Sequence, residues 1–215
     1  MKLFPRLLLM LLAIAPLSAC AASPTALVEG DDYELIAEPG PFAPLAGKIE
    51  VVEVFGYTCP HCAHFEPQLE AWVAKQPADV RFTPVPAAFG GYWDSYARAF
   101  YAAEQVGVRQ RSHADVFKAL HVQGSLPVQN VSPDELATFY AQYGVQPQRF
   151  VEALRSPQVD DKVKYARAFA MRAKVTGTPM LIVNGKYLVK GKTFDDTLRI
   201  AGALVARERT GAGRR

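Results

Sequence analysis

The fold of this chain is decided by the stretch Ile49-Glu50-Val51-Val52-Glu53-Val54-Phe55-Gly56-Tyr57-Thr58-Cys59-Pro60-His61-Cys62. Its first half, residues 49–55, is β-branched and apolar enough to predict a buried strand. After the second cysteine, apolar side chains recur at helical spacing, namely Phe65, Leu69, Trp72 and Val73. A buried strand is therefore expected to run into a helix, with both cysteines at the N-terminal end of that helix.

Pro60 sets the start of this helix. Proline is favoured at the first helical position, so Cys59 is expected to be the N-cap and the more exposed sulfur. A Cys59 thiolate would accept hydrogen bonds from first-turn amides at the positive end of the helix dipole, and His61 would add a donor or a positive charge. Cys62 lies one turn further in, within reach of a disulfide. Because a stabilised thiolate makes the disulfide a better oxidant, we expect the pair to oxidise other thiols.

Two other uses of these cysteines are weaker. A stapling disulfide across so short a loop would remove little chain entropy. A zinc ion would find Cys59, His61, Cys62 and His64 close together, but a tetrahedral site usually draws ligands from a second segment, and the chain has no second Cys-x-x-Cys. We therefore expect neither a metal nor another cofactor.

The N-terminus predicts export. Lys2 and Arg6 precede an apolar run from Leu7 to Pro16. This run is too short to span a membrane, so residues 1–20 are expected to be a secretory signal. Two cleavage patterns compete there: Ala19-Cys20-Ala21 suits ordinary signal peptidase, whereas Leu17-Ser18-Ala19-Cys20 resembles a lipobox that would leave Cys20 as a lipidated first residue. We favour the lipoprotein, hence a periplasmic protein with a possible membrane anchor at Cys20. Either pattern implies a compartment that permits disulfides.

Composition bounds the remaining possibilities. The chain has 215 residues, of which 50% are hydrophobic, enough for one core and an appended subdomain. The net charge of +3 includes no basic block in the middle of the chain, so no nucleic-acid partner is expected.

The order of predicted elements indicates an α/β fold. Further strands are expected at Tyr33–Ile36 and Val80–Val85, and helices over most of Trp93–Val175, where Ser132-Pro133-Asp134-Glu135 forms a capping-box signature. Two last strands, residues 180–183 and 187–189, flank Asn184-Gly185, which signals a two-residue hairpin. A final helix is expected over Phe194–Arg207.

Several of these motifs together closely resemble the DsbA family of thiol:disulfide oxidants. They are Cys59-Pro60-His61-Cys62 after a strand, Phe65-Glu66, Thr178-Pro179 and Val183-Asn184-Gly185-Lys186-Tyr187. The resemblance implies a thioredoxin fold interrupted by an inserted α-helical domain, with thioredoxin-like parts at 25–91 and 176–208 and the insertion at 92–175. It also implies substrates that are unfolded or partly folded exported proteins containing cysteine, and re-oxidation by a DsbB-like membrane quinone reductase.

The same resemblance assigns roles to further residues. Thr178-Pro179 would be a cis peptide packed against the cysteines, with the Thr178 backbone open to an extended peptide; the alternative is a simple strand-entry proline. Glu53 would lie beneath the pair and relay a proton for Cys62, and Glu66 would lie near the same helical face; the alternatives are a solvent-facing strand residue and a surface acid. In known relatives a lysine flanks the active site, but the corresponding position in this chain is near Pro84. The charge partner of Glu53 is therefore left open.

These observations favour a monomeric, extracytoplasmic dithiol oxidase that uses Cys59 and Cys62. A reductase or isomerase would need a less oxidising pair and usually a dimerisation domain, which the sequence lacks. A peptide-binding chaperone or a metal-binding protein could use the same groove or Cys/His cluster, and these alternatives stay open at this stage.

Overall fold

The computed structural model describes residues 26–212. Within that range the chain forms a five-stranded mixed sheet in the order β1-β5-β4-β2-β3. The strands are β1 (Tyr33–Leu35), β2 (Ile49–Phe55), β3 (Val80–Pro86), β4 (Met180–Val183) and β5 (Tyr187–Val189). β2 pairs parallel with β3 and antiparallel with β4, so the strand that leads to the cysteines is flanked on both sides. The predicted α/β class is confirmed.

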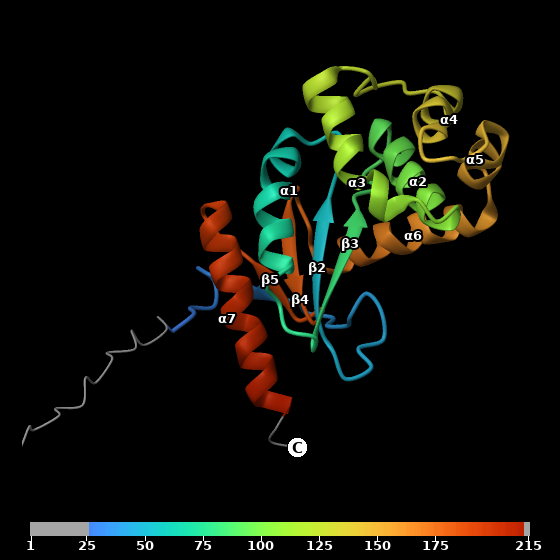
Figure 1. Cartoon of the computed structure of the whole chain (residues 1–215). Helices are drawn as coiled ribbons and strands as arrows, with labels where there is room; N and C mark the ends of the chain where they lie inside the picture. Colours follow the sequence, from blue (N-terminus) through green and yellow to red (C-terminus); the bar gives the residue numbers. More distant parts are fainter. Residues whose placement is uncertain (1–25, 213–215) are drawn as a thin grey trace, which may run out of the picture.

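Helices cover both faces of the sheet (Figure 1). α1 (Pro60–Val73) and α7 (Phe194–Ala212) lie over one face, where Val51 and Leu181 of the sheet pack with Leu69 and Leu204 of the helices. Alternate strand residues point to opposite faces of a sheet. Val52 and Val54 accordingly belong to the core on the other face.

The chain between β3 and β4 is helical. Its elements are α2 (Tyr92–Gln105), α3 (Arg109–Lys118), the π-helical segment η1 (Ala119–Gln123), α4 (Pro133–Ala141), α5 (Pro147–Leu154) and α6 (Pro157–Arg172). The predicted capping box at the start of α4 is confirmed, because the Ser132 hydroxyl accepts from the Glu135 amide and the Glu135 carboxylate accepts from the Ser132 amide. Buried side chains of these helices form one continuous core with β2, so the inserted segment packs directly on the sheet.

The predicted strands at residues 180–183 and 187–189 match β4 and β5, but the predicted length of the turn between them and the predicted end of the last helix were wrong. The hairpin after β4 has a three-residue loop, because Val183 pairs with Tyr187. Asn184 and Gly185 do adopt positive φ angles of 51° and 60°, as their sequence suggests, but Lys186 is added before pairing resumes. The last helix extends beyond Arg207 to Ala212, since Val205 is still buried against the sheet and Arg209 pairs with Asp79.

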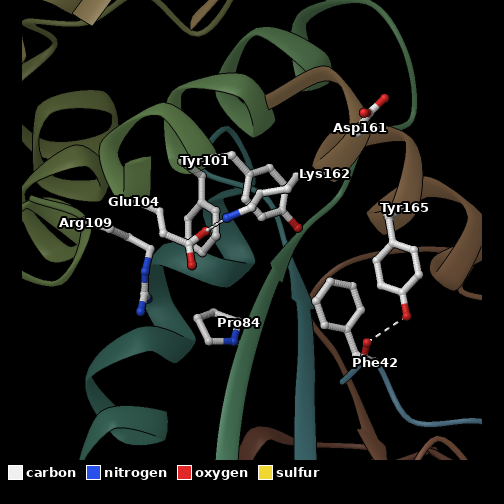
Figure 2. Close-up of a pocket in the computed structure, with 9 residues that line it drawn as sticks. Phe42, Pro84, Tyr101, Glu104, Arg109, Asp161, Lys162 and Tyr165 are labelled. Atoms are coloured by element: carbon white, nitrogen blue, oxygen red, sulfur yellow. Dashed lines mark hydrogen bonds and ion pairs between the residues drawn. The ribbon is translucent and has the colours of Figure 1, made fainter. Parts of the chain in front are cut away.

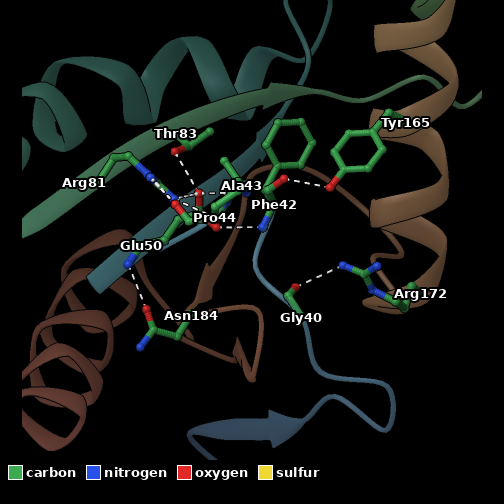
Figure 3. Close-up of polar contacts among 10 residues, drawn as sticks. All are labelled: Gly40, Phe42, Ala43, Pro44, Glu50, Arg81, Thr83, Tyr165, Arg172 and Asn184. Carbon is green, nitrogen blue, oxygen red and sulfur yellow. Dashed lines mark hydrogen bonds and ion pairs between the residues drawn. The ribbon is translucent and has the colours of Figure 1, made fainter. Parts of the chain in front are cut away.

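A buried carboxylate ties the loop before β2 to the rest of the fold (Figure 3). Glu50 is fully buried, and its carboxylate accepts hydrogen bonds from two amides of that loop and two side chains of β3: Phe42 N at 2.7 Å, Ala43 N at 3.3 Å, Arg81 Nη2 at 2.8 Å and Thr83 Oγ1 at 3.2 Å. The same loop is held from α6, because Tyr165 donates to the Phe42 carbonyl and Arg172 to the Gly40 carbonyl. The site below therefore rests on a sheet whose flanking loop is fixed.

Among residues 26–212, every helix is either too short or too polar to cross a membrane.

Candidate active site

Cys59 and Cys62 lie where β2 passes into α1, as the sequence predicts. Pro60 is the first residue of α1, and Cys59 is its N-cap with an extended backbone. Cys59 is only 7% exposed and Cys62 is fully buried, so Cys59 is the more accessible sulfur but much less open than expected. The reason is the loop before β4, since Cys59 Sγ lies 3.4 Å from the Thr178 carbonyl oxygen.

The two thiols differ greatly in acidity. The pKa of Cys59 falls to about 5, chiefly because the Cys62 thiol can donate to its thiolate; the Thr178 side chain and the backbone amides of Cys62 and His61 add to this against the effect of burial. The Cys59 side chain makes no cap hydrogen bond of normal geometry, so these amides act through proximity. Burial raises the pKa of Cys62 far above its ordinary value, and the neighbouring Cys59 and Glu53 raise it further. The Gly56 amide, 3.4 Å from Cys62 Sγ, opposes that rise.

Pro60 and His61 are both exposed beside Cys59. The backbone amide of His61 is one of the groups that lower the pKa of Cys59.

Thr178-Pro179 forms a cis peptide bond, as expected, opposite the cysteines. Next to it lies a cavity of about 380 Å³ between the start of α1, the loop after β5 and the start of α7. Pro179, Phe65 and Phe194 give this cavity apolar walls, and Lys192 and Thr193 give it a polar edge. An extended peptide lying against Thr178 would meet this cavity.

Glu53 is buried on the α1 side of β2, so it is not a solvent-facing residue. It is 1% exposed, and neither carboxylate oxygen has a hydrogen-bond partner. Burial is the main cause that raises its pKa well above the ordinary value, followed by the charges of Glu66 and Cys59. In the pairing of β2 with β3 its neighbour is Pro84, which offers no charge or donor.

Glu66 faces the inserted helices instead of open solvent. Its carboxylate lies 3.4 Å from Nε2 of His113 on α3, and both side chains are largely buried, at 16% and 14% exposed. The other ring nitrogen of His113 lies 2.7 Å from the Tyr57 hydroxyl. Sequence reasoning missed His113, because nothing in its local pattern separates it from an ordinary helix residue.

The described residues contain no group of three or more His, Cys, Asp or Glu side chains placed to hold a metal ion. His64 is exposed on α1. Cys20, the expected lipidation site, lies outside the described residues.

A cavity of about 510 Å³ lies away from the cysteines, between β3, α2 and α6 (Figure 2). Four aromatic and four charged residues line it together with Pro84, and Lys162 and Glu104 form an ion pair at one side. None of the predicted site residues lines it.

Two thiols of such different acidity, held at a helix start across from a cis proline, are what a thioredoxin-fold disulfide oxidoreductase requires. The chain is an enzyme of that class, and the family model described as Thioredoxin matches residues 45–201.

Comparison with known proteins narrows the class to one family. The thiol:disulfide interchange protein DsbA of Pseudomonas aeruginosa is 37% identical over 205 residues, covering 94% of this chain and 95% of that protein. The DsbA of Azotobacter vinelandii is 39% identical over 167 residues, covering 76% and 77% of the two chains. The crystal structure of oxidoreductase DsbA from Xylella fastidiosa superposes with a TM-score of 0.84 at 59% identity, covering 86% of this chain and 98% of that chain. The chain therefore belongs to the DsbA family, and its predicted thioredoxin fold with inserted helices is confirmed.

Proposed function

We propose that this enzyme donates a Cys59–Cys62 disulfide to newly exported proteins that contain reduced cysteines. One observation carries the direction of the reaction: the lowered pKa of Cys59, about 5, beside a buried Cys62 whose pKa is raised. A stabilised Cys59 thiolate favours the reduced enzyme, so the oxidised enzyme gives up its disulfide readily.

The reaction has two exchange steps. A substrate thiolate attacks Cys59 Sγ, the Cys59–Cys62 bond breaks, and Cys62 leaves as a thiolate that takes up a proton. A second substrate thiolate then attacks the substrate sulfur of the mixed disulfide and releases Cys59 as a thiolate. The substrate loses two electrons and two protons; one proton is balanced by the proton on Cys62, and the other goes to solvent.

Glu53 is proposed as the acid that supplies the Cys62 proton. Burial raises the pKa of its carboxyl group, so the group keeps its proton at pH values where an exposed glutamate is ionised. Glu53 also interacts electrostatically with both cysteines. Glu66, which interacts electrostatically with Glu53 and is partly exposed, would return the proton from solvent.

Substrate binding is proposed at Thr178-Pro179. The cis bond, the short distance between Thr178 and Cys59, and the adjacent apolar cavity support docking of an extended, unfolded segment whose cysteine reaches Cys59. Pro60 and His61 are exposed at the same edge and would contact that segment.

The cellular setting follows from the family and the N-terminal sequence. We propose a periplasmic monomer with thioredoxin-like parts at 25–91 and 176–208 around a helical domain at 92–175, re-oxidised by a DsbB-like membrane quinone reductase. Cys20 would be the lipidated first residue. Intact mass of the mature protein tests the anchor: an acylated Cys20 supports it, and an unmodified N-terminus at Ala22 contradicts it.

Thiolate absorbance against pH, together with the equilibrium against glutathione, tests the oxidase assignment. The expected results are a Cys59 pKa of about 5, a strongly oxidising cysteine pair, and rapid oxidation of a reduced, unfolded protein. A Cys59 that titrates like an ordinary thiol, or a protein that reduces or isomerises disulfides better than it forms them, would contradict the proposal.

A further inference from the structure

Tyr57 connects the cysteines to the inserted helices. It lies two residues before Cys59, is 2% exposed, and packs among Phe55, Phe100 and Phe117. Two histidines from the inserted segment hold it by different groups. His113 Nδ1 of α3 lies 2.7 Å from its hydroxyl, and His121 Nε2 of η1 lies 2.7 Å from its carbonyl oxygen.

The partners of these rings fix which nitrogen carries the proton. A carbonyl oxygen only accepts, so His121 Nε2 must be the donor to Tyr57. For His113, the nearby Glu66 carboxylate favours a proton on Nε2, although 3.4 Å is longer than a normal hydrogen bond. In that tautomer Nδ1 is the acceptor, and the Tyr57 hydroxyl donates to it.

The resulting chain of contacts joins three parts of the molecule. It runs from the loop after β2 (Tyr57), through α3 (His113), to α1 (Glu66), and the α1 residue lies one helical turn beyond Cys62. The π-helical segment that carries His121 is a backbone form often found at functional sites.

We propose that His113 and His121 are positioning residues for the thiol chemistry: they fix Tyr57, and through it the Cys59 end of α1, while His113 also orients the Glu66 carboxylate. This deepens the proposed function and rests on it. The groups that stabilise the Cys59 thiolate, namely the Cys62 thiol, the Thr178 side chain and the first-turn amides, act only at short range. Movement of the segment from Tyr57 to Cys59 would weaken these stabilising interactions in the reduced enzyme. In the oxidised enzyme the disulfide bond holds the two sulfurs together.

Five variants test this, one of them His121→Phe, which removes the hydrogen bond to the Tyr57 carbonyl oxygen. His113→Phe keeps a ring in the aromatic cluster and removes both polar contacts; His113→Asn keeps an amide oxygen near the position of Nδ1. Tyr57→Phe removes the hydroxyl alone, and the Tyr57→Phe/His113→Phe double variant measures the coupling. Tyr143→Phe is the matched control, because it removes a phenol hydrogen bond of 2.7 Å to Asp115 on the same helix α3, away from the cysteines.

The expected result is a shift of the glutathione equilibrium toward the oxidised protein by about five-fold in His113→Phe and in Tyr57→Phe, which corresponds to one lost hydrogen bond. The Cys59 titration should move upward in the same variants. The double variant should shift no further than either single variant, and His113→Asn should recover part of the wild-type equilibrium. His121→Phe should shift the equilibrium in the same direction.

A purely structural role would give another pattern. The single variants would then lower the melting temperatures of both redox forms equally, with the Cys59 titration and the glutathione equilibrium unchanged, and this result would overturn the inference. If His113→Phe does not fold, Tyr57→Phe decides by the same two readouts. A wild-type enzyme with an ordinary Cys59 pKa would instead overturn the proposed function, so the two failures are distinguishable.

Discussion

Replacing Glu53 by Gln should stabilise the protein, and the gain should grow with pH. The Glu53 carboxyl group is buried and neither of its oxygens has a partner, so its pKa is raised, chiefly by burial. In the unfolded chain the same group titrates near the ordinary value of about 4.3. Above that value the unfolded state has lost a proton that the folded state keeps.

The sign and size follow from linkage. Because the folded state binds more protons, the free energy of unfolding falls as pH rises, by about 1.4 kcal/mol per pH unit, until the folded pKa is reached. Gln has a similar shape and does not titrate. The difference in free energy of unfolding between Glu53→Gln and wild type should therefore increase by about 1.4 kcal/mol per pH unit over this window, or about 3 kcal/mol across two units.

Urea denaturation of the oxidised proteins, from about pH 5 to about pH 8, measures this difference without titration of the two cysteines. Glu50→Gln is the matched control, because Glu50 is buried in the same strand but its carboxylate has four donors, including Arg81. Breaking that pair should cost about 2 kcal/mol, less than a fully buried pair because Arg81 is 31% exposed. A constant difference between Glu53→Gln and wild type at all pH values would refute the reasoning.

Three further changes have expected outcomes. Cys62→Ala should accumulate mixed disulfides with substrates on non-reducing gels while Cys59→Ala accumulates none, because only Cys59 is reachable; equal trapping would reverse the roles. Gly56→Ala should lower the free energy of unfolding by about 1–3 kcal/mol in denaturant, because a methyl group there would overlap the Trp93 indole, and shortening Trp93 to Leu should restore part of it. Ser132→Ala should cost about 1 kcal/mol by loss of the α4 cap, and an unchanged denaturation midpoint would show that the cap contributes nothing.

The parts of this fold that could be read from the sequence are local ones. Pro60 after Cys59 identifies the start of α1, and the capping box identifies the start of α4, because each signal involves residues within one helical turn. The apolar run of β2 predicts its burial for the same reason. The loop of the last hairpin was misjudged by one residue, since turn residues constrain the turn but not where strand pairing resumes.

Contacts that depend on how the inserted helices pack could not be predicted. His113 meets Tyr57 across 56 positions and His121 meets it across 64. The exposure of Cys59 was overestimated for the same reason, because the loop that covers it, at Thr178, is 119 positions away. Such contacts follow from the arrangement of helices on the sheet, for which the sequence carries no local signal.

The residue opposite Glu53 links the stability of this enzyme to its chemistry. A cation there would hold Glu53 ionised and stabilise the fold, but in the proposed mechanism it would also remove the proton that Glu53 supplies to Cys62. Pro84 supplies no cation, so Glu53 stays protonated at the expense of stability, and the charges of Glu66 and a Cys59 thiolate strengthen that state. The proton is therefore held most firmly in the reduced enzyme. Formation of the Cys59–Cys62 disulfide removes the thiolate charge and with it one of the causes that keep the Glu53 carboxyl group neutral.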